Sequence, residues 1–296
     1  MCLLLLFLLA ALPAAGDTLS LVIRAQTDFE RVVLPASPQL GDTATCIQSQ
    51  AALVPVARPE ELSQVHFRKG YCLLLHAIMT RDAGESRQAD TEFRAALASW
   101  PVPKGAAPAP PPDAAGLRVL SAIARIQADP NGKNLPNAER PNAERSDLER
   151  DLESGSTPGG CTGSVMPLSI CQEVQATGRL WQVWLAERQD RIPQAVRLAA
   201  EFRGSGWAYW VAARDAMNLR HYKEAVEAFQ QAVQVWAIRR APAGTLSFLA
   251  PQPDVPRAQE ALGLAQFLAG EPAAALATLD TGIRAAHGQD AQPIFV

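Results

Sequence analysis

The chain has 296 residues, enough for one elongated domain or two compact domains that each bury a core. Charged residues make up 19% of the chain and the formal net charge is −3, and no cluster of Lys and Arg with interleaved aromatic residues offsets this balance. This charge pattern argues against nucleic acid as a partner. Alanine is abundant, β-branched residues are sparse and strand-like alternation is never sustained, which predicts a mostly helical chain.

The amino terminus has the outline of a secretory signal peptide, residues 1–16. An uncharged apolar run, 1–12, is followed by Pro13, three small residues and the polar Asp17. The run is about half as long as the roughly 20 residues that a spanning helix needs, so we expect cleavage near Ala15 or Gly16 and no integral membrane segment afterwards. A different start or a buried amino-terminal helix is the alternative, because no Lys or Arg precedes the apolar run.

Removing the signal peptide leaves four cysteines, an even number that fits two disulfides in an oxidising compartment. Cys161 and Cys171 are the favoured pair, because closing their loop would staple a segment with little core of its own. Cys46 and Cys72 could join two neighbouring helices, but Cys72 stands in an apolar run where a buried free thiol is equally common. The cysteines lack CxxC spacing and the histidines are scattered, so we expect no metal and no cofactor.

The spacing of apolar residues predicts four helices in an amino-terminal region, 17–101. Their predicted ranges are 19–33, 43–54, 60–79 and 87–100. The last helix carries Ala89, Phe93 and Ala96 on one face, and together with the end of the third helix it forms a predicted hairpin at about 70–101.

The middle of the chain is the least regular part of the sequence. The Pro-rich segment 102–115 cannot hold a helix or a central strand and is typical of an extended linker. Residues 116–179 contain a predicted helix at 117–127, then a polar low-complexity insertion with a tandem five-residue copy at 136–145, and the loop between the paired cysteines. A short charged helix is compatible with 146–153, where Ser146 can cap it, but it has almost no apolar face.

Three helix hairpins are predicted in succession within 180–288, followed by a tail, 289–296, without a clear pattern. They cover about 180–202, 206–239 and 256–287, with a loop insertion at 240–255 between the second and the third. The second hairpin is the best formed, because a tight turn after Leu219 separates its helices and the second helix carries Ala225, Phe229 and Ala232 on one face.

This spacing resembles the tetratricopeptide repeat (TPR) family. In that family small residues let two antiparallel helices approach closely, and the aromatic residue fills the gap between successive hairpins. Ala275, Leu279 and Gly282 repeat the pattern fifty residues after Ala225, which is one 34-residue period plus a sixteen-residue insertion. The resemblance implies an all-α fold, in which antiparallel hairpins stack as a short right-handed solenoid that the linker and the insertion interrupt. The motif specifies packing and leaves the function open.

Binding is the leading functional hypothesis, because the sequence contains no P-loop, no GxGxxG after a strand, no HExxH and no GxSxG elbow, and therefore offers no catalytic site. In the TPR family the first helix of each hairpin lines a concave groove. The positions that the resemblance places in this groove are Trp207, Trp210, Arg214, Met217, Asn218, Arg257, Glu260 and Leu264. Trp and Arg are often decisive in interfaces. The alternative for Trp207 and Trp210 is core packing, together with Trp181 and Trp184.

The prediction from sequence is therefore a helical-repeat scaffold that binds a protein or peptide in a secreted or periplasmic location. Two other hypotheses stay open. An exported enzyme or carbohydrate-associated protein could carry its site in the non-repeat middle, 116–171. A cytoplasmic assembly factor would be the reading if the apolar amino terminus is not a signal.

Overall fold

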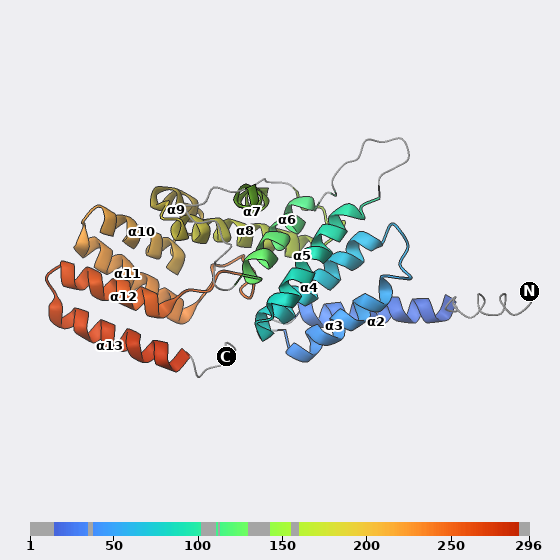
Figure 1. Cartoon of the computed structure of the whole chain (residues 1–296), viewed down its shortest axis with the longest axis horizontal. Helices are drawn as coiled ribbons and strands as arrows, with labels where there is room; N and C mark the ends of the chain where they lie inside the picture. The colour runs from blue at the N-terminus through green and yellow to red at the C-terminus, as the bar shows by residue number, and fades with distance from the viewer. Residues whose placement is uncertain are drawn as a thin grey trace, which may run out of the picture.

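The computed structural model describes residues 15–34, 38–101, 111, 113–129, 143–154 and 160–289. These residues form twelve α-helices, α2 to α13, and one short 3-10 helix, η1, and they contain no β-strand. The prediction of an all-α fold is confirmed. Consecutive helices pack against each other along an elongated molecule (Figure 1), with α2–α5 at one end, α9–α13 at the other and α6–α8 between them.

The amino-terminal half begins with four helices, each within four residues of a predicted one. They are α2 (Ala15–Val33), α3 (Leu40–Leu53), α4 (Leu62–Thr80) and α5 (Ala83–Ala98). Helix α5 starts earlier than predicted because the Asp82 carboxylate accepts hydrogen bonds from the backbone N–H groups of Gly84 and Glu85, which caps the helix. Phe93 is fully buried where α4 and α5 meet, as its spacing predicted.

A disulfide joins α3 to α4. Cys46 and Cys72, whose Cα atoms are 6.2 Å apart, are bonded, and both side chains are fully buried. Sequence reasoning left this pair open between a bridge and a free thiol. The bridge lies beside a cluster of three aromatic rings, Phe29, Phe67 and Tyr71, whose centroids are 5.9 to 6.1 Å apart. Burial raises the pKa of the Tyr71 phenol well above its ordinary value.

The middle of the chain is more ordered than its composition predicts. It contains α6 (Ala114–Gln127), α7 (Ala143–Ser154) and α8 (Leu168–Arg188), and α6 is buried between α5, α7 and α8. Two predictions are wrong here. Helix α7 does have an apolar face, since Leu148 and Leu152 are buried in the core, and α8 begins twelve residues before the predicted start at 180.

A glycine explains how α6 and α8 come so close. A Cβ atom at Gly178 of α8 would lie 2.7 Å from Cγ1 of Val119 in α6, closer than real side-chain contacts allow. Helix α8 is therefore buried on several sides along its length. Because polar residues are buried along with apolar ones, the sequence of α8 shows no apolar stripe at helical spacing. The sequence analysis therefore did not predict the first half of this helix.

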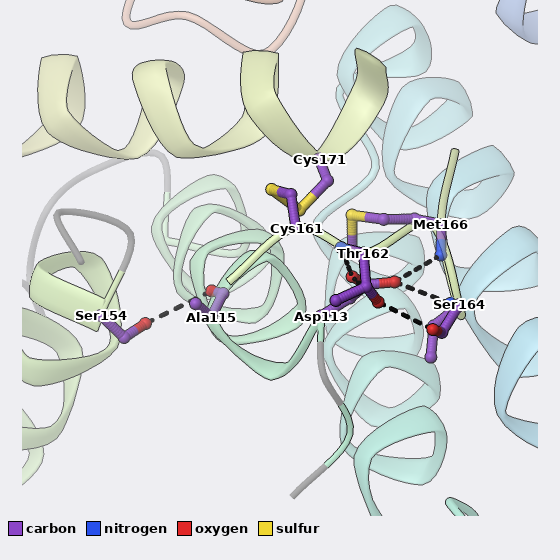
Figure 2. Close-up of a disulfide and its surroundings, with 9 residues drawn as sticks. Asp113, Ala115, Ser154, Cys161, Thr162, Ser164, Met166 and Cys171 are labelled. Carbon is purple, nitrogen blue, oxygen red and sulfur yellow. Dashed lines mark hydrogen bonds between the residues drawn. A yellow bond between two sulfur atoms is a disulfide. The ribbon is translucent and has the colours of Figure 1, made fainter. Parts of the chain in front are cut away.

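The second disulfide closes the predicted loop between Cys161 and Cys171, and Asp113 holds that loop in place (Figure 2). The buried Asp113 carboxylate accepts hydrogen bonds from the backbone N–H groups of Thr162, Val165 and Met166, at 2.7 to 3.2 Å. It also accepts a bond from the Thr162 hydroxyl at 3.2 Å. The residue just before α6 thus organises a loop some fifty residues later in the sequence.

The carboxy-terminal half contains the three hairpins that the sequence predicted. Their helices are α8 with α9 (Ile192–Ala199) and η1 (Ala200–Phe202), α10 (Gly206–Asn218) with α11 (Tyr222–Ile238), and α12 (Val255–Leu268) with α13 (Pro272–Gln289). The side chains of Ala225, Phe229 and Ala232 are all fully buried. Gly263 plays the close-packing role in the last hairpin, because a Cβ there would lie 2.7 Å from Leu279.

The insertion between α11 and α12 folds back onto α8. The indole N–H of Trp181 donates to the carbonyl of Leu249 at 2.7 Å, and the backbone N–H of Leu246 donates to the hydroxyl of Thr177 at 2.9 Å. Leu246 and Leu249 belong to the same core as the amino-terminal helices. The insertion therefore connects the two halves of the molecule.

Several sequence predictions lie wholly or mostly outside the described residues. These are the signal peptide up to residue 14, most of the Pro-rich linker (102–110), most of the tandem copy at 136–145, and the tail after 289. Among the helices that are described, none combines the length and the apolar character needed to cross a membrane.

Candidate functional site

The first helices of the three carboxy-terminal hairpins, α8, α10 and α12, meet at one buried carboxylate. Glu187 of α8, whose side chain is 1% exposed, accepts a hydrogen bond from Arg214 of α10 at 2.7 Å. It also accepts from Arg257 of α12 at 3.1 Å. We call the surface that these three helices share the first-helix face. Two of the eight predicted groove residues, Arg214 and Arg257, are thus brought together on it.

Further contacts fix both arginines. Arg214 also bonds to Asp190, in the turn after α8, at 3.1 Å. The guanidinium of Arg257 lies 5.5 Å from the ring centroid of Trp210, within the range of a cation–π contact. A buried carboxylate between two cations is stable only while its partners stay in place, because an unpaired buried charge is costly. The cluster therefore sets the position of α12 relative to α8 and α10.

The two predicted groove tryptophans are core residues. Trp207 and Trp210 are 4% and 3% exposed, and both pack against Trp236 of α11, with ring centroids 5.4 and 5.9 Å apart. Trp210 also packs against Phe229. The core alternative that the sequence left open therefore describes these side chains, although their contacts are with the following helix. They offer no surface to a partner in this conformation. Their rings belong to the core on which the first-helix face is built.

The remaining predicted positions differ in exposure. Met217 is partly buried against the core, whereas Asn218 and Glu260 are exposed. Leu264 is 51% exposed. On the first-helix face, α12 therefore carries the paired cation Arg257 and, two helical turns later, the solvent-exposed apolar side chain of Leu264.

Sequence reasoning missed three residues at this face, namely Phe267, Leu268 and Glu187. Phe267 and Leu268 follow Leu264 by three and four positions and are 61% and 42% exposed. We call Leu264, Phe267 and Leu268 the α12 apolar edge. Helical spacing alone could have found it, since residues three and four apart share a face. Glu187 had no such signal, because its partners are 27 and 70 residues away in the sequence.

A shallow hollow of about 340 Å³ adjoins the apolar edge. It lies between the end of α12, at Leu268 and Ala269, and the turn between α10 and α11, where Arg220 and Lys223 are exposed. His221 in the same turn lies 3.3 Å from Glu224. The hollow extends the surface next to the apolar edge beyond α12 itself.

Another cluster of titratable groups lies in the amino-terminal half. Glu92 of α5 is 2.6 Å from both His66 Nδ1 and Lys69 Nζ of α4. Burial alone would raise the pKa of Glu92, but the hydrogen bonds from His66 and Lys69 outweigh it and hold this pKa below its ordinary value. The cluster ties α4 to α5. Among the described residues, no group of three or more His, Cys, Asp and Glu side chains could hold a metal ion.

The sequence matches no family model and no curated protein. Among solved structures, the chain is similar to BtubC (BKLC) from P. vanneervenii, with 14% sequence identity and a TM-score of 0.42, over 86% of this chain and 92% of that chain.

Proposed function

We propose that this chain is a TPR-like scaffold that binds another protein or a peptide through its first-helix face, outside the cytoplasm. The α12 apolar edge supplies the hydrophobic contact, and the Glu187 cluster beside it keeps the three helices in register. Exposed Asn218 and Glu260 supply polar contacts at the margin. The proposed role is binding, without a catalytic step.

The observation that carries the proposal is the exposure of Leu264, at a position where the TPR resemblance places a groove, together with that of Phe267, three residues later on the same helix. Single exposed apolar residues are common, but three on one helical edge, on the same helix as the fixed cation Arg257, form a surface with both hydrophobic and polar character. Burial of such side chains by a partner would release about 25 cal/mol for each Å² of apolar surface.

Two observations support a location outside the cytoplasm. Four cysteines are joined in two disulfides, and such bridges persist in oxidising compartments. The apolar run at 1–12 is followed by small residues of the type that a signal peptidase cleaves after. Mass spectrometry of the protein exported by an expressing cell tests this part. We expect loss of the first fifteen or sixteen residues and four protected thiols, whereas an intact Met1 with free thiols would contradict export.

A peptide-display selection tests the binding face. Peptides are selected on the wild-type protein, and their affinities are then measured for the double variant Leu264→Asp/Phe267→Asp. We expect a loss of at least about tenfold in affinity, because the selected contacts would face two carboxylates in place of apolar side chains.

Leu276→Asp is the matched control. Leu276 lies on α13 of the same hairpin and is 71% exposed, but it is not on the first-helix face. The control should bind the selected peptides as the wild type does. Equal binding by the double variant, or an equal loss in the control, would place the contact elsewhere.

A further inference from the structure

A second pocket lies away from the first-helix face, between the start of α10 and the end of α11. It has a volume of about 290 Å³, and its wall includes Arg203, Ser205, Gly206, Arg239 and Arg240. The residues come from the turn before α10 and from the segment that follows α11, so two separate parts of the chain build the pocket.

The pocket has an excess of positive charge. Its three arginines are exposed, and none of them has a carboxylate partner among the residues that the structure describes. The acidic residue in the pocket wall, Glu201, already bonds to Arg179 at 2.7 Å. The carbonyl end of α11 also lies here and carries partial negative charge, but Arg239 and Arg240 follow it directly and offset it.

The start of α10 adds hydrogen-bond donors to the same wall. The Ser205 hydroxyl accepts a bond from the backbone N–H of Ala208, which caps the helix. The N–H groups of Gly206 and Trp207, the first two of the helix, find no backbone acceptor in the described part of the chain. Such N–H groups at a helix start favour an anion.

A buried indole packs behind this wall. The Nε1–H of Trp236 has no acceptor in the described structure, and Trp236 is 4% exposed. The indole packs directly against Gly206: a Cβ atom at that position would lie 2.4 Å from Nε1. Because residue 206 is a glycine, the indole can lie directly behind the pocket wall.

We propose that this pocket binds a divalent oxyanion, that is, a phosphate or sulfate group, either free or as the ester of a small molecule. Guanidinium groups bind such oxyanions through two parallel hydrogen bonds, and three of them can surround one anion. The volume of the pocket exceeds that of a single phosphate group and leaves space for a small attached group. This site is separate from the proposed protein-binding face.

Isothermal titration of the whole protein tests the site, with inorganic phosphate, inorganic sulfate, glycerol phosphate and acetate as probes at constant ionic strength. We expect saturable one-to-one binding of phosphate and sulfate, with acetate at least about tenfold weaker. Stronger binding of glycerol phosphate than of inorganic phosphate would identify an ester ligand, and equal binding would identify the free ion.

Variants place the binding in this pocket. Arg239→Gln/Arg240→Gln and, separately, Arg203→Gln should each weaken phosphate binding by about tenfold or more. These are exposed side chains without ion pairs among the described residues, so the variants should keep the wild-type melting temperature. Arg87→Gln is the control, because Arg87 is an exposed arginine on α5. No saturation by phosphate or sulfate, or wild-type affinity in both pocket variants, would overturn the proposal.

Discussion

The amino-terminal half of this molecule, up to and including the first turn of α8, and the carboxy-terminal half beyond it are held together by different means. Both disulfides, Cys46–Cys72 and Cys161–Cys171, lie in α3, α4, the loop before α8 and the first turn of α8. No cysteine occurs after Cys171. From α9 onward the helices are held by small residues, a cluster of tryptophans and the Glu187 ion pairs.

The difference follows the regularity of the sequence. In the carboxy-terminal half, two hairpins repeat the same spacing of small and aromatic residues, so each helix finds a complementary neighbour. In the amino-terminal half the hairpins are irregular and long segments separate them. There, covalent bridges and the Asp113 anchor limit the freedom of the unfolded chain and of the loop before α8. Substitutions in each half test this contrast.

The largest effect is expected at the aromatic position of each hairpin. Phe93 and Phe229 are both fully buried at the same place in their motifs. Each change to alanine should lower the free energy of unfolding by about 3–5 kcal/mol, because it leaves a cavity in a packed core. Urea denaturation under oxidising conditions measures the loss. A loss below about 1 kcal/mol at either position would mean that the site can collapse, contrary to its packing.

Limited proteolysis distinguishes the two variants. Phe229→Ala should open the carboxy-terminal half to protease first, since no disulfide lies beyond α8. Phe93→Ala should leave fragments of the amino-terminal half linked until a reductant is added. The same cleavage pattern in both variants would show that the halves do not differ in this way.

Removal of the disulfides comes next in size. In the chain-entropy account, the loop of 26 residues between Cys46 and Cys72 contributes about 3.5 kcal/mol, and the loop of ten between Cys161 and Cys171 about 2.7 kcal/mol. Double alanine variants of each pair, compared by urea denaturation, measure these losses. An equal or larger loss for the shorter loop would show that contacts of the loop, rather than chain entropy, dominate its effect.

The Asp113 anchor should have a smaller effect with a specific signature. Asp113→Ala leaves the N–H groups of Val165 and Met166 without an acceptor, and each such buried group costs about 1–3 kcal/mol if no water replaces the carboxylate. The variant should also let a reductant reach Cys161–Cys171 faster while Cys46–Cys72 reacts at its usual rate. Thiol labelling over time measures both rates, and an equal acceleration of the two would indicate general loosening.

The smallest expected effect is on the dependence of stability on pH. The pKa of Glu92 is lower in the folded protein than its ordinary value of 4.5, so ionised Glu92 stabilises the fold above that value. This contribution is lost as the pH falls through the folded-state pKa. Glu92→Gln should therefore flatten the decline in stability below about pH 4.5, measured by thermal melting. If the decline in stability at acid pH is the same in the variant as in the wild type, other carboxylates account for that decline.

How far the sequence predicts the fold depends on the local pattern. The spacing of Ala225, Phe229 and Ala232 was enough to place the helices of that hairpin, because small and aromatic residues at helical spacing require a neighbouring helix. The first half of α8 was missed because polar residues such as Gln175 and Thr177 are buried along with its apolar residues. The apolar periodicity of a helix weakens when its buried positions include polar residues.

The candidate site was predictable only in part for a related reason. Positions on one helix follow from spacing, and these gave Leu264 and would have given Phe267. Contacts between distant helices do not follow from spacing. The pairing of Glu187 with Arg214 and Arg257 depends on the angles at which three hairpins stack, and so does the burial of Trp207 and Trp210. Those angles result from packing along the whole half.

The insertion between α11 and α12 has a consequence for folding kinetics. In a simple repeat array each unit touches only its neighbours, so the contact order is low and folding can spread from any unit. Here the bond from Trp181 to Leu249 joins residues 68 apart and bypasses α9, α10 and α11. That loop closure needs the intervening helices to be roughly in place. It adds a late nonlocal step, and we expect it to couple unfolding of the array to that of the disulfide-linked half.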